Sequence, residues 1–199
     1  MRRDPDIGEE YLRAHIIGEL KGLSAPLIIA DYDPAWPGQF RDEAEKIRSA
    51  MVERALRIEH VGSTSVPGLP AKPIIDIVLV VADSANEQNY ASALQKAGYQ
   101  LRIREPEWYE HRMFRGAQNG VNPHVFSNGC PEVDRMFVFR DWLRTNPSDR
   151  ELYAQYKRAL ARQQWKYTQN YADAKTTIIR EILARARSLD IPSTAESPY

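Results

Sequence analysis

The sequence has almost no cysteine and no net charge, and both shortages restrict the class of protein. Cys130 is the single cysteine, so no internal disulfide can form, which fits a reducing compartment. The 27 basic and 27 acidic residues balance, so the overall charge gives no sign of nucleic-acid binding. Any basic surface must be local, and no nucleic-acid partner is predicted.

Long apolar runs are also missing. The longest strongly apolar stretch, residues 74–82, is interrupted by Asp76 and is too short to span a bilayer. The first residues, Met1 to Asp6, are not followed by the apolar core of a signal peptide. The sequence therefore predicts no membrane partner and a cytoplasmic location.

What remains is an ordinary globular composition, with 43% hydrophobic and 27% charged residues. A length of 199 residues fits one domain with an appendage and is enough to bury a core. We expect a helical extension over residues 1–26, a main domain over 27–187, and a disordered tail over 188–199, where proline and serine recur.

Apolar spacing and turn residues predict a mixture of helices and strands. Helices are expected up to about residue 24, after Pro37, and at 86–97, 136–143, 152–165 and 171–186. Strands are expected at 27–30, 57–61, 74–81, 108–115 and 122–126. This order implies an α/β (α+β) fold in which helices pack against a mixed β-sheet.

Residues 59–76 carry most of the candidate chemistry. Gly62 and Ser63 directly follow a predicted strand, and glycine lets a backbone come close to a ligand. Successive N–H groups, with the hydroxyls of Ser63, Thr64 and Ser65, could hold a phosphate. A plain tight turn favours the same residues, and this feature alone indicates the turn.

Asp76 lies inside an apolar strand, where an isolated carboxylate costs several kcal/mol unless it is paired. Its partner is either a metal cation or a structural ion pair with Lys72 or an arginine. Asp76 follows Gly62 by 14 positions, so pairing of the two strands would bring the loop against the carboxylate. A P-loop is disfavoured because Lys72 is followed by Pro73 and a strand.

Residues 58–77 resemble the signature of the GrpB family, which is assigned to the nucleotidyltransferase superfamily. The resemblance covers about residues 27–187. Its further blocks are residues 32–37, 123–125, 139–144 and 153–157, and Tyr171 with Lys175. It implies a nucleotidyltransferase-like fold, with a mixed sheet flanked by helices and with additional C-terminal helices.

The superfamily pattern pairs a Gly-Ser turn with Asp-x-Asp/Glu on the next strand, and the two carboxylates hold divalent metals. Gly62, Ser63 and Asp76 match, but the second acidic position is Val78, which cannot bind a metal. The resemblance implies a divalent metal (Mg²⁺ or Mn²⁺) at Asp76. His60 and His124 are additional candidate ligands by their chemistry, and a site with imidazoles would hold Mn²⁺ or Zn²⁺ more readily than Mg²⁺. Both histidines are equally explained as hydrogen-bonded strand residues.

Basic side chains are candidates for contacts with an anionic ligand. The candidates are Lys72, Arg112, Arg115, Arg140, Arg144 and Lys157. Arg112 and Arg115 should point to opposite faces of a strand, so at most one lines the site. Arg140 is the preferred phosphate contact because it belongs to a block that resembles the family.

Two functions follow as hypotheses, both with a nucleotide or another phosphorylated small molecule as partner. The first is a divergent nucleotidyltransferase that moves a nucleoside monophosphate to an unknown acceptor, with Asp76 and Lys72 as catalytic residues. The alternative is a non-catalytic module that binds a nucleotide or phospholigand at a degenerate site. A third carboxylate near Asp76 would favour catalysis, whereas apolar enclosure of Val78 would favour binding alone.

Overall fold

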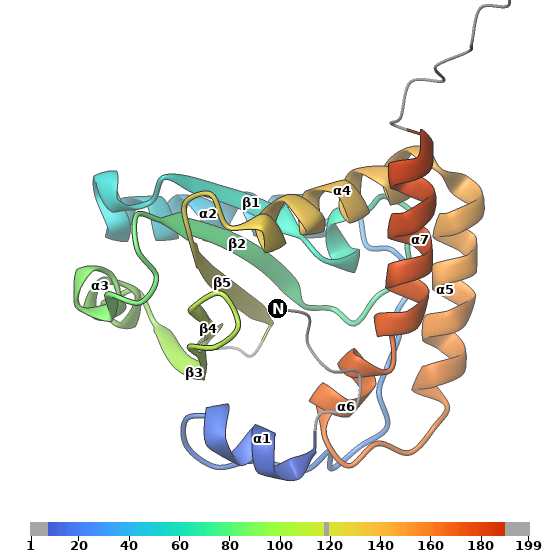
Figure 1. Cartoon of the computed structure of the whole chain (residues 1–199), viewed down its shortest axis with the longest axis horizontal. Coiled ribbons are helices and arrows are strands. Elements are labelled where there is room, and N and C mark those ends of the chain that lie inside the picture. The colour runs from blue at the N-terminus through green and yellow to red at the C-terminus, as the bar shows by residue number, and fades with distance from the viewer. Residues whose placement is uncertain (1–7, 118–119, 190–199) are drawn as a thin grey trace, which may run out of the picture.

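A computed structural model describes residues 8–117 and 120–189 (Figure 1). Five strands form one sheet in the order β1-β2-β5-β4-β3. Only the β2–β5 pair is parallel, and the other neighbours are antiparallel. The strands are β1 Arg57–Val61, β2 Ile75–Val81, β3 Tyr99–Glu105, β4 His111–Gly116 and β5 Val121–Ser127. The predicted α+β class with a mixed sheet flanked by helices is confirmed.

Helices α2 (Trp36–Met51) and α3 (Ala91–Lys96) cover one face of the sheet (Figure 1). Proline lies in the first turn of α2, where its missing N–H is not needed. Ile47 and Met51 follow at helical spacing and are fully buried against Ile77 and other residues of β2. The apolar residues of β2 at odd positions therefore make this face the larger core.

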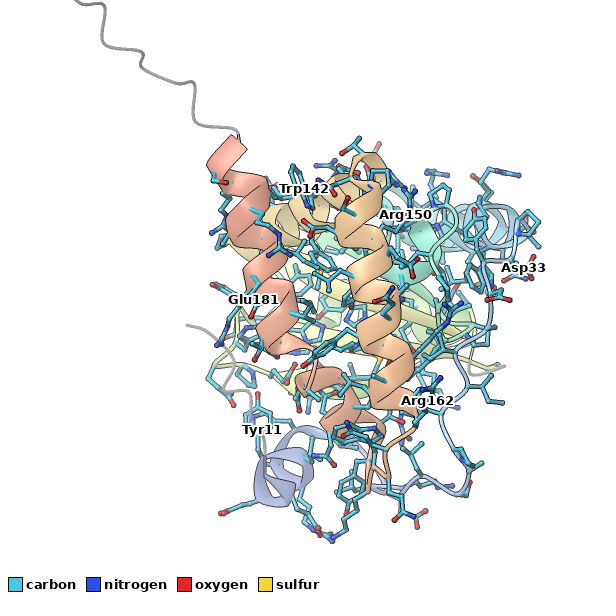
Figure 2. The ribbon with its side chains drawn as sticks, turned by 90° about the vertical axis from the view of Figure 1, so that its right-hand side faces the viewer. Tyr11, Asp33, Trp142, Arg150, Arg162 and Glu181 are labelled. Atoms are coloured by element: carbon cyan, nitrogen blue, oxygen red, sulfur yellow. The ribbon has the colours of Figure 1, made fainter. Side chains whose placement is uncertain are left out.

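Helix α4 (Pro131–Thr145) covers part of the opposite face, where its apolar residues pack on Val78, Val80 and Phe126. Helices α5 (Pro147–Ala161) and α7 (Thr176–Leu189) lie side by side at the end of the sheet, as Figures 1 and 2 show. They pack on apolar residues of the β1–β2 connection. The short helix α6 (Thr168–Asp173) precedes α7.

The chain that precedes α2 is less regular than predicted. Helix α1 spans only Glu9–His15, because Ile16 turns to an extended conformation and pairs with Ile103 of β3. The expected strand at 27–30 is reduced to one bridge between Ala30 and Ala71. Residues 1–7 of the predicted extension, and 190–199 of the predicted tail, lie outside the described residues.

Other boundaries also differ from the prediction, and α4 and α5 each begin five residues earlier than expected. The expected helix at 86–97 is broken at Tyr90, whose buried phenol donates to the Ser84 carbonyl. Strand β4 starts at His111, later than expected, because Tyr109 and Glu110 adopt positive φ in a turn. The expected helix at 171–186 is divided into α6 and α7. Three 3₁₀-helical turns complete the description: Val52–Arg54, Ser63–Ser65 and Glu87–Asn89.

Strand β3 was not predicted from the sequence, and it forms one edge of the sheet. Burial alternates only weakly along this strand, because most of its residues are partly buried. Its apolar residues Leu101 and Ile103 are separated and followed by arginines. The pairing with β4 contains a bulge between Leu101 and Ile103, which disturbs the alternation further.

Asp149 at the start of α5 holds three helices together. It accepts hydrogen bonds at 2.7 Å from Trp142 Nε1 of α4 and at 2.7 Å from Arg185 Nη2 of α7. The hydrogen bond from Arg185 lowers the pKa of Asp149 below its ordinary value, against the opposing effect of burial, and the bond from Trp142 lowers it further. The ionised carboxylate therefore stabilises the folded protein.

We expect Asp149→Asn to lower the free energy of unfolding by about 1.5–3 kcal/mol at neutral pH, the range for hydrogen bonds to charged groups. A carboxylate with a lowered folded-state pKa stabilises fully above the ordinary value of about 3.9, and that contribution is lost as the pH falls through the folded value. Urea unfolding should therefore show the difference from wild type shrinking below about pH 4. A difference that persists in acid, or one no larger than for the exposed Asp42→Asn, would contradict this role.

Candidate functional site

The carboxylate of Asp76 lies against the backbone of Gly62. The antiparallel register pairs Val61 with Asp76, so the residue that follows β1 falls beside this side chain. Gly62 has φ of 69°, and a Cβ atom there would lie 2.5 Å from Asp76 Oδ2. The glycine is therefore required by the turn and by the carboxylate, before any ligand is considered.

Two adjoining cavities meet at Asp76. The larger, about 390 Å³, lies over the β2, β5 and β4 strands and is bounded by α6 and by the chain after α1. The smaller, about 210 Å³, lies beside α4 and α7. The residues that line both are Ser63, Asp76, His124 and Lys175. These four residues form the junction between the cavities.

The larger cavity is rich in cationic side chains. They are Lys21, Lys72, Arg102, Arg115, Lys157 and Lys175, against the carboxylates Glu19 and Asp76. Lys72 and Lys175 both lie over the ring of Tyr171, with their Nζ atoms 5.6 and 4.8 Å from its centre. Within residues 8–117 and 120–189, neither lysine has a carboxylate oxygen within 4.0 Å of its ammonium nitrogen.

The closeness of these cations to one another affects their pKa values. Burial lowers the pKa of Lys175 to about 8, and the neighbouring Lys72 adds to the effect. Burial also lowers the pKa of Lys72, with a further contribution from Arg115. Both shifts are opposed by the attraction of Asp76. Like charges are therefore held together in the cavity with only partial compensation.

Lys157 is the most enclosed of these cations, with 2% of its surface exposed. It donates a hydrogen bond to the Pro70 carbonyl, and burial lowers its pKa to about 6. This contact ties α5 to the loop before β2. Arg115 borders the cavity, whereas Arg112 points to the opposite face and is paired with Glu87, as expected from the alternation of strand side chains.

Four side chains form a row from β3 to β2 on the face that carries the cavity. His111 Nδ1 lies 2.7 Å from Glu105 Oε2, and His111 Nε2 lies 3.0 Å from His124 Nδ1. His124 Nε2 lies 3.6 Å from Asp76 Oδ1. Burial raises the pKa of Asp76, but His124 and the Asn122 amide outweigh burial and lower it overall.

The donor set around Asp76 does not fit a two-metal centre. Val78, at the second acidic position of the superfamily pattern, is 0% exposed and packs with Val61, Val80 and Phe126. In the described part of the chain, no group of three His, Cys, Asp or Glu residues is placed to hold a metal ion. Asp76 and His124 would supply one oxygen and one nitrogen ligand, which is too few for a two-metal centre.

His60, the second histidine considered as a ligand, is not brought to Asp76. It pairs with Ile77 in the β1–β2 register and so lies on the opposite face of the sheet. Its Nε2 is 3.0 Å from Thr64 Oγ1, and its ring stacks on Phe40 with centres 4.8 Å apart. Burial lowers the pKa of His60 to about 4, so the imidazole is neutral and serves the core.

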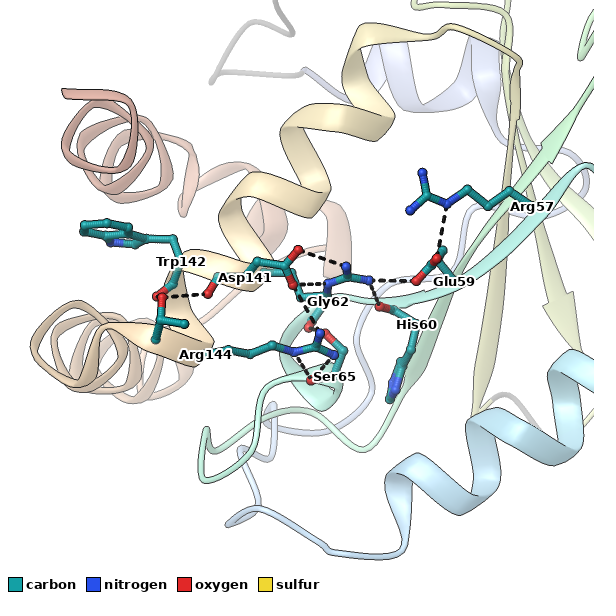
Figure 3. Close-up of polar contacts among 10 residues, drawn as sticks. Arg57, Glu59, His60, Gly62, Ser65, Asp141, Trp142 and Arg144 are labelled. Carbon is teal, nitrogen blue, oxygen red and sulfur yellow. Dashed lines mark hydrogen bonds and ion pairs between the residues drawn. The ribbon is translucent and has the colours of Figure 1, made fainter. Parts of the chain in front are cut away.

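Arg140 connects α4 to β1, and Arg144 connects α4 to Ser65 of the β1–β2 connection (Figure 3). Arg140 donates at 3.0 Å to both Glu59 Oε2 and the His60 carbonyl, and at 2.8 Å to Asp141. Arg144 donates to the Ser65 carbonyl at 2.9 Å. Although Arg140 borders the smaller cavity, its guanidinium is already engaged by carboxylates.

The hydroxyls of the β1–β2 connection have different surroundings. Ser63 borders both cavities, and Thr64 borders the larger one while donating to the Ile74 carbonyl at 3.0 Å. Ser65 is turned away and donates to the Gly62 carbonyl at 2.6 Å. Of the three, Ser63 is the one best placed to meet a ligand.

Several cavity residues were not among the predicted site residues. They are Arg102, His111, Asn122 and Lys175, and Glu105, which contacts His111 from outside the cavity, was not predicted either. Lys175 had one signal in the sequence, because it belongs to a C-terminal block that resembles the family. Asn122 precedes His124 by two positions and therefore shares its face of β5, so strand alternation alone could have indicated it.

The mixed five-stranded sheet, its flanking helices and the Gly-Ser turn against Asp76 define an α+β protein with a carboxylate at a cavity junction. The chain belongs to the GrpB family, because the family model described as GrpB protein matches residues 26–185. A UPF0157 protein of Halalkalibacterium halodurans is 56% identical over 180 residues, which cover 90% of this chain and 92% of that protein. The crystal structure of the conserved protein GrpB from Enterococcus faecalis has a TM-score of 0.72 at 31% identity, covering 81% of this chain and 98% of that one.

A more distant relative is the dephospho-CoA kinase of Mycolicibacterium paratuberculosis, with 29% identity over 199 residues. The match covers 87% of this chain and 49% of that protein.

No helix among the described residues is both long and apolar enough to cross a membrane.

The Gly62–Asp76 contact can be tested by stability. Gly68 also has positive φ, at 76°, but a Cβ atom there would meet nothing within 4 Å among the described residues. We expect Gly68→Ala to cost about 1 kcal/mol from its backbone conformation, and Gly62→Ala to cost about 3 kcal/mol or more. Chemical denaturation would measure both, and Asp76→Ala should partly relieve the cost of Gly62→Ala. Equal losses for the two glycine variants would show that the close approach is unimportant.

Proposed function

We propose that this protein binds a phosphorylated small molecule, a nucleotide or another phosphoester, in the larger cavity, with lysine and arginine side chains as the phosphate ligands. The observation that supports this most is the pair of lysines over Tyr171 with no carboxylate partner among the described residues. Clustered cations raise the free energy of the unliganded protein, and a phosphate group between them would remove that cost.

The dimensions and chemistry of the cavity agree with such a ligand. Its volume of about 390 Å³ falls in the usual range for small-molecule sites, roughly 300–1,000 Å³. Lys72 and Lys175 would contact the phosphate from one side, and Arg115 would contact it from β4. Ser63 would donate a hydroxyl from the junction. In this proposal Lys72 is a phosphate ligand, whereas Arg140, already engaged by Asp141 and Glu59, is not.

A metal ion has a smaller role here than in the superfamily pattern. Divalent metals normally neutralise the triphosphate and are held by two carboxylates. In this chain the second carboxylate position is the buried Val78, and cationic side chains line the space instead. Phosphate binding should therefore persist when divalent metals are removed.

A second candidate function is transfer of a nucleoside monophosphate, and the position of Asp76 favours it. Asp76 lies at the junction of a cationic cavity and a smaller one bordered by Phe139, Leu143 and Ile179. A phosphorylated donor in the first and an acceptor in the second would meet there. Release of pyrophosphate from a nucleoside triphosphate would distinguish transfer from binding alone.

Thermal unfolding would test binding with pyrophosphate, nucleoside triphosphates and dephospho-CoA, each in EDTA and in Mg²⁺. Dephospho-CoA is included because relatives named dephospho-CoA kinase match this chain over about half of their length. A ligand at about one hundred times its dissociation constant adds about 2.7 kcal/mol, a rise of about 5–10 °C for a domain of this size. We expect this rise for at least one of these compounds, and we expect it to survive in EDTA.

Lys72→Met and Lys175→Met should abolish the rise without lowering the stability of the unliganded protein, because each removes a poorly compensated charge. Lys46→Met is the matched control: Lys46 also lies over a tyrosine, 4.5 Å from the centre of the Tyr99 ring, but is paired with Glu43 away from the cavity. Its variant should keep the full response. No rise with any compound, or an unchanged rise in both cavity variants, would contradict the proposed function.

A further inference from the structure

The row Glu105–His111–His124–Asp76 determines which ring nitrogen of each histidine carries a hydrogen. The row follows the sheet register, since Glu105 pairs with His111, and Met113, on the same face as His111, pairs with His124. Its three contacts measure 2.7, 3.0 and 3.6 Å from Glu105 to Asp76. The first two are hydrogen-bond distances, and the last is longer than one.

These distances assign the hydrogens when both imidazoles are neutral. An ionised carboxylate only accepts hydrogen bonds, so His111 carries its hydrogen on Nδ1, which donates to Glu105. The other nitrogen of His111, Nε2, is then an acceptor, and His124 must donate to it from Nδ1. In neutral His124, Nε2 is left without a hydrogen and faces Asp76 Oδ1 at 3.6 Å, which is longer than a hydrogen bond. His124 lowers the pKa of Asp76 only in its protonated form.

The Glu105 end of the row is buried, which keeps water from replacing its hydrogen bonds. Glu105 and His111 are 1% and 2% exposed, and the Phe126 ring stacks on His111 with centres 4.8 Å apart. The Tyr11 hydroxyl donates to the second oxygen of Glu105 at 3.1 Å. Water therefore has little access to the Glu105 end of the row, whereas His124 borders both cavities.

We infer that Glu105 and His111 are positioning residues that keep His124 in the Nδ1–H form, so that its Nε2 acts as a general base toward the ligand in the cavity. This rests on the proposed function for the identity of the ligand. A hydroxyl of the ligand, or a water beside it, would donate its proton to Nε2. The imidazolium would then carry the transferred hydrogen on Nε2, and the Asp76 carboxylate, 3.6 Å from that nitrogen, would stabilise the new positive charge.

A second observation indicates which part of the ligand lies here. Asn122 donates from Nδ2 to Asp76 Oδ1 at 3.2 Å, and its Oδ1 is buried without a hydrogen-bond partner among the described residues. Asp76 and His124 Nε2 are therefore two acceptors at one point of the cavity wall, with a third acceptor, Asn122 Oδ1, buried next to Asp76. Such a wall accepts a hydroxyl, so the ligand class is a phosphoester with a free hydroxyl near its phosphate, as in sugar phosphates and nucleotides.

The test is ¹⁵N NMR of the histidine side chains in the whole protein, in phosphate-free, mildly alkaline buffer, where imidazoles are ordinarily neutral. We expect the His124 signals to show a hydrogen on Nδ1 and a bare Nε2. In His111→Phe the acceptor is lost, so His124 should become a mixture of both forms. Phe126→Leu removes the ring that stacks on His111 but no hydrogen bond of the row, and it should leave His124 unchanged.

A hydrogen on Nε2 of His124 in the wild-type protein would overturn the inference, as would an unchanged His124 spectrum in a folded His111→Phe variant. If His111→Phe does not fold, the wild-type spectrum alone decides. Because no phosphate ligand is present, this result is independent of the binding experiment above. Failure of phosphate binding with a bare Nε2 would reject the proposed function and leave the positioning of His124 standing.

Discussion

The backbone of Gly62 touches the carboxylate of Asp76, and both the fold and the site depend on this contact. The antiparallel pairing of β1 with β2 places the two residues side by side. The chain can turn there only with a glycine, since a Cβ atom would lie 2.5 Å from Asp76 Oδ2. This turn also places Ser63 at the junction of the two cavities. A carboxylate in the middle of the sheet is thereby held in place and kept accessible from one side.

Around this fixed point the protein accumulates positive charge that its own carboxylates do not neutralise. Structural cations elsewhere in the described chain include Arg140, paired with Glu59, and Arg185, paired with Asp149. Lys72 and Lys175 are instead opposed mainly by the more distant Asp76. Buried charges without close partners are costly, and their retention at one cavity is consistent with a binding role. Ligand sites commonly give up stability in this way.

The sequence predicts the central strands well, because their signals are local. The bounds of β1 agree with the expectation, and the long apolar run produces β2 one residue later than expected. Strand β3 escapes prediction because charged residues interrupt its apolar positions and a bulge disturbs its alternation. The helix up to residue 24 was expected from local spacing, whereas pairing of Ile16 with Ile103 ends it earlier.

The candidate site is predictable only in part for a related reason. Gly62, Ser63 and Asp76 are close in sequence and belong to one motif, so their convergence can be inferred. Lys175 reaches the same point from the far end of the chain, and its approach depends on how α6 and α7 pack. Arg140 illustrates the converse: its block in the sequence suggested a ligand contact, but its partners are Glu59 and the His60 carbonyl from β1.

The most direct test of the central claim is to locate a tetrahedral oxyanion in crystals of the protein. Tungstate is a suitable probe, because it resembles phosphate in shape and charge and its anomalous scattering identifies it without ambiguity. The account predicts a peak in the larger cavity within hydrogen-bonding distance of Lys72 and Lys175, retained in crystals grown with EDTA. Peaks confined to surface lysines and arginines, with none in the cavity, would contradict it.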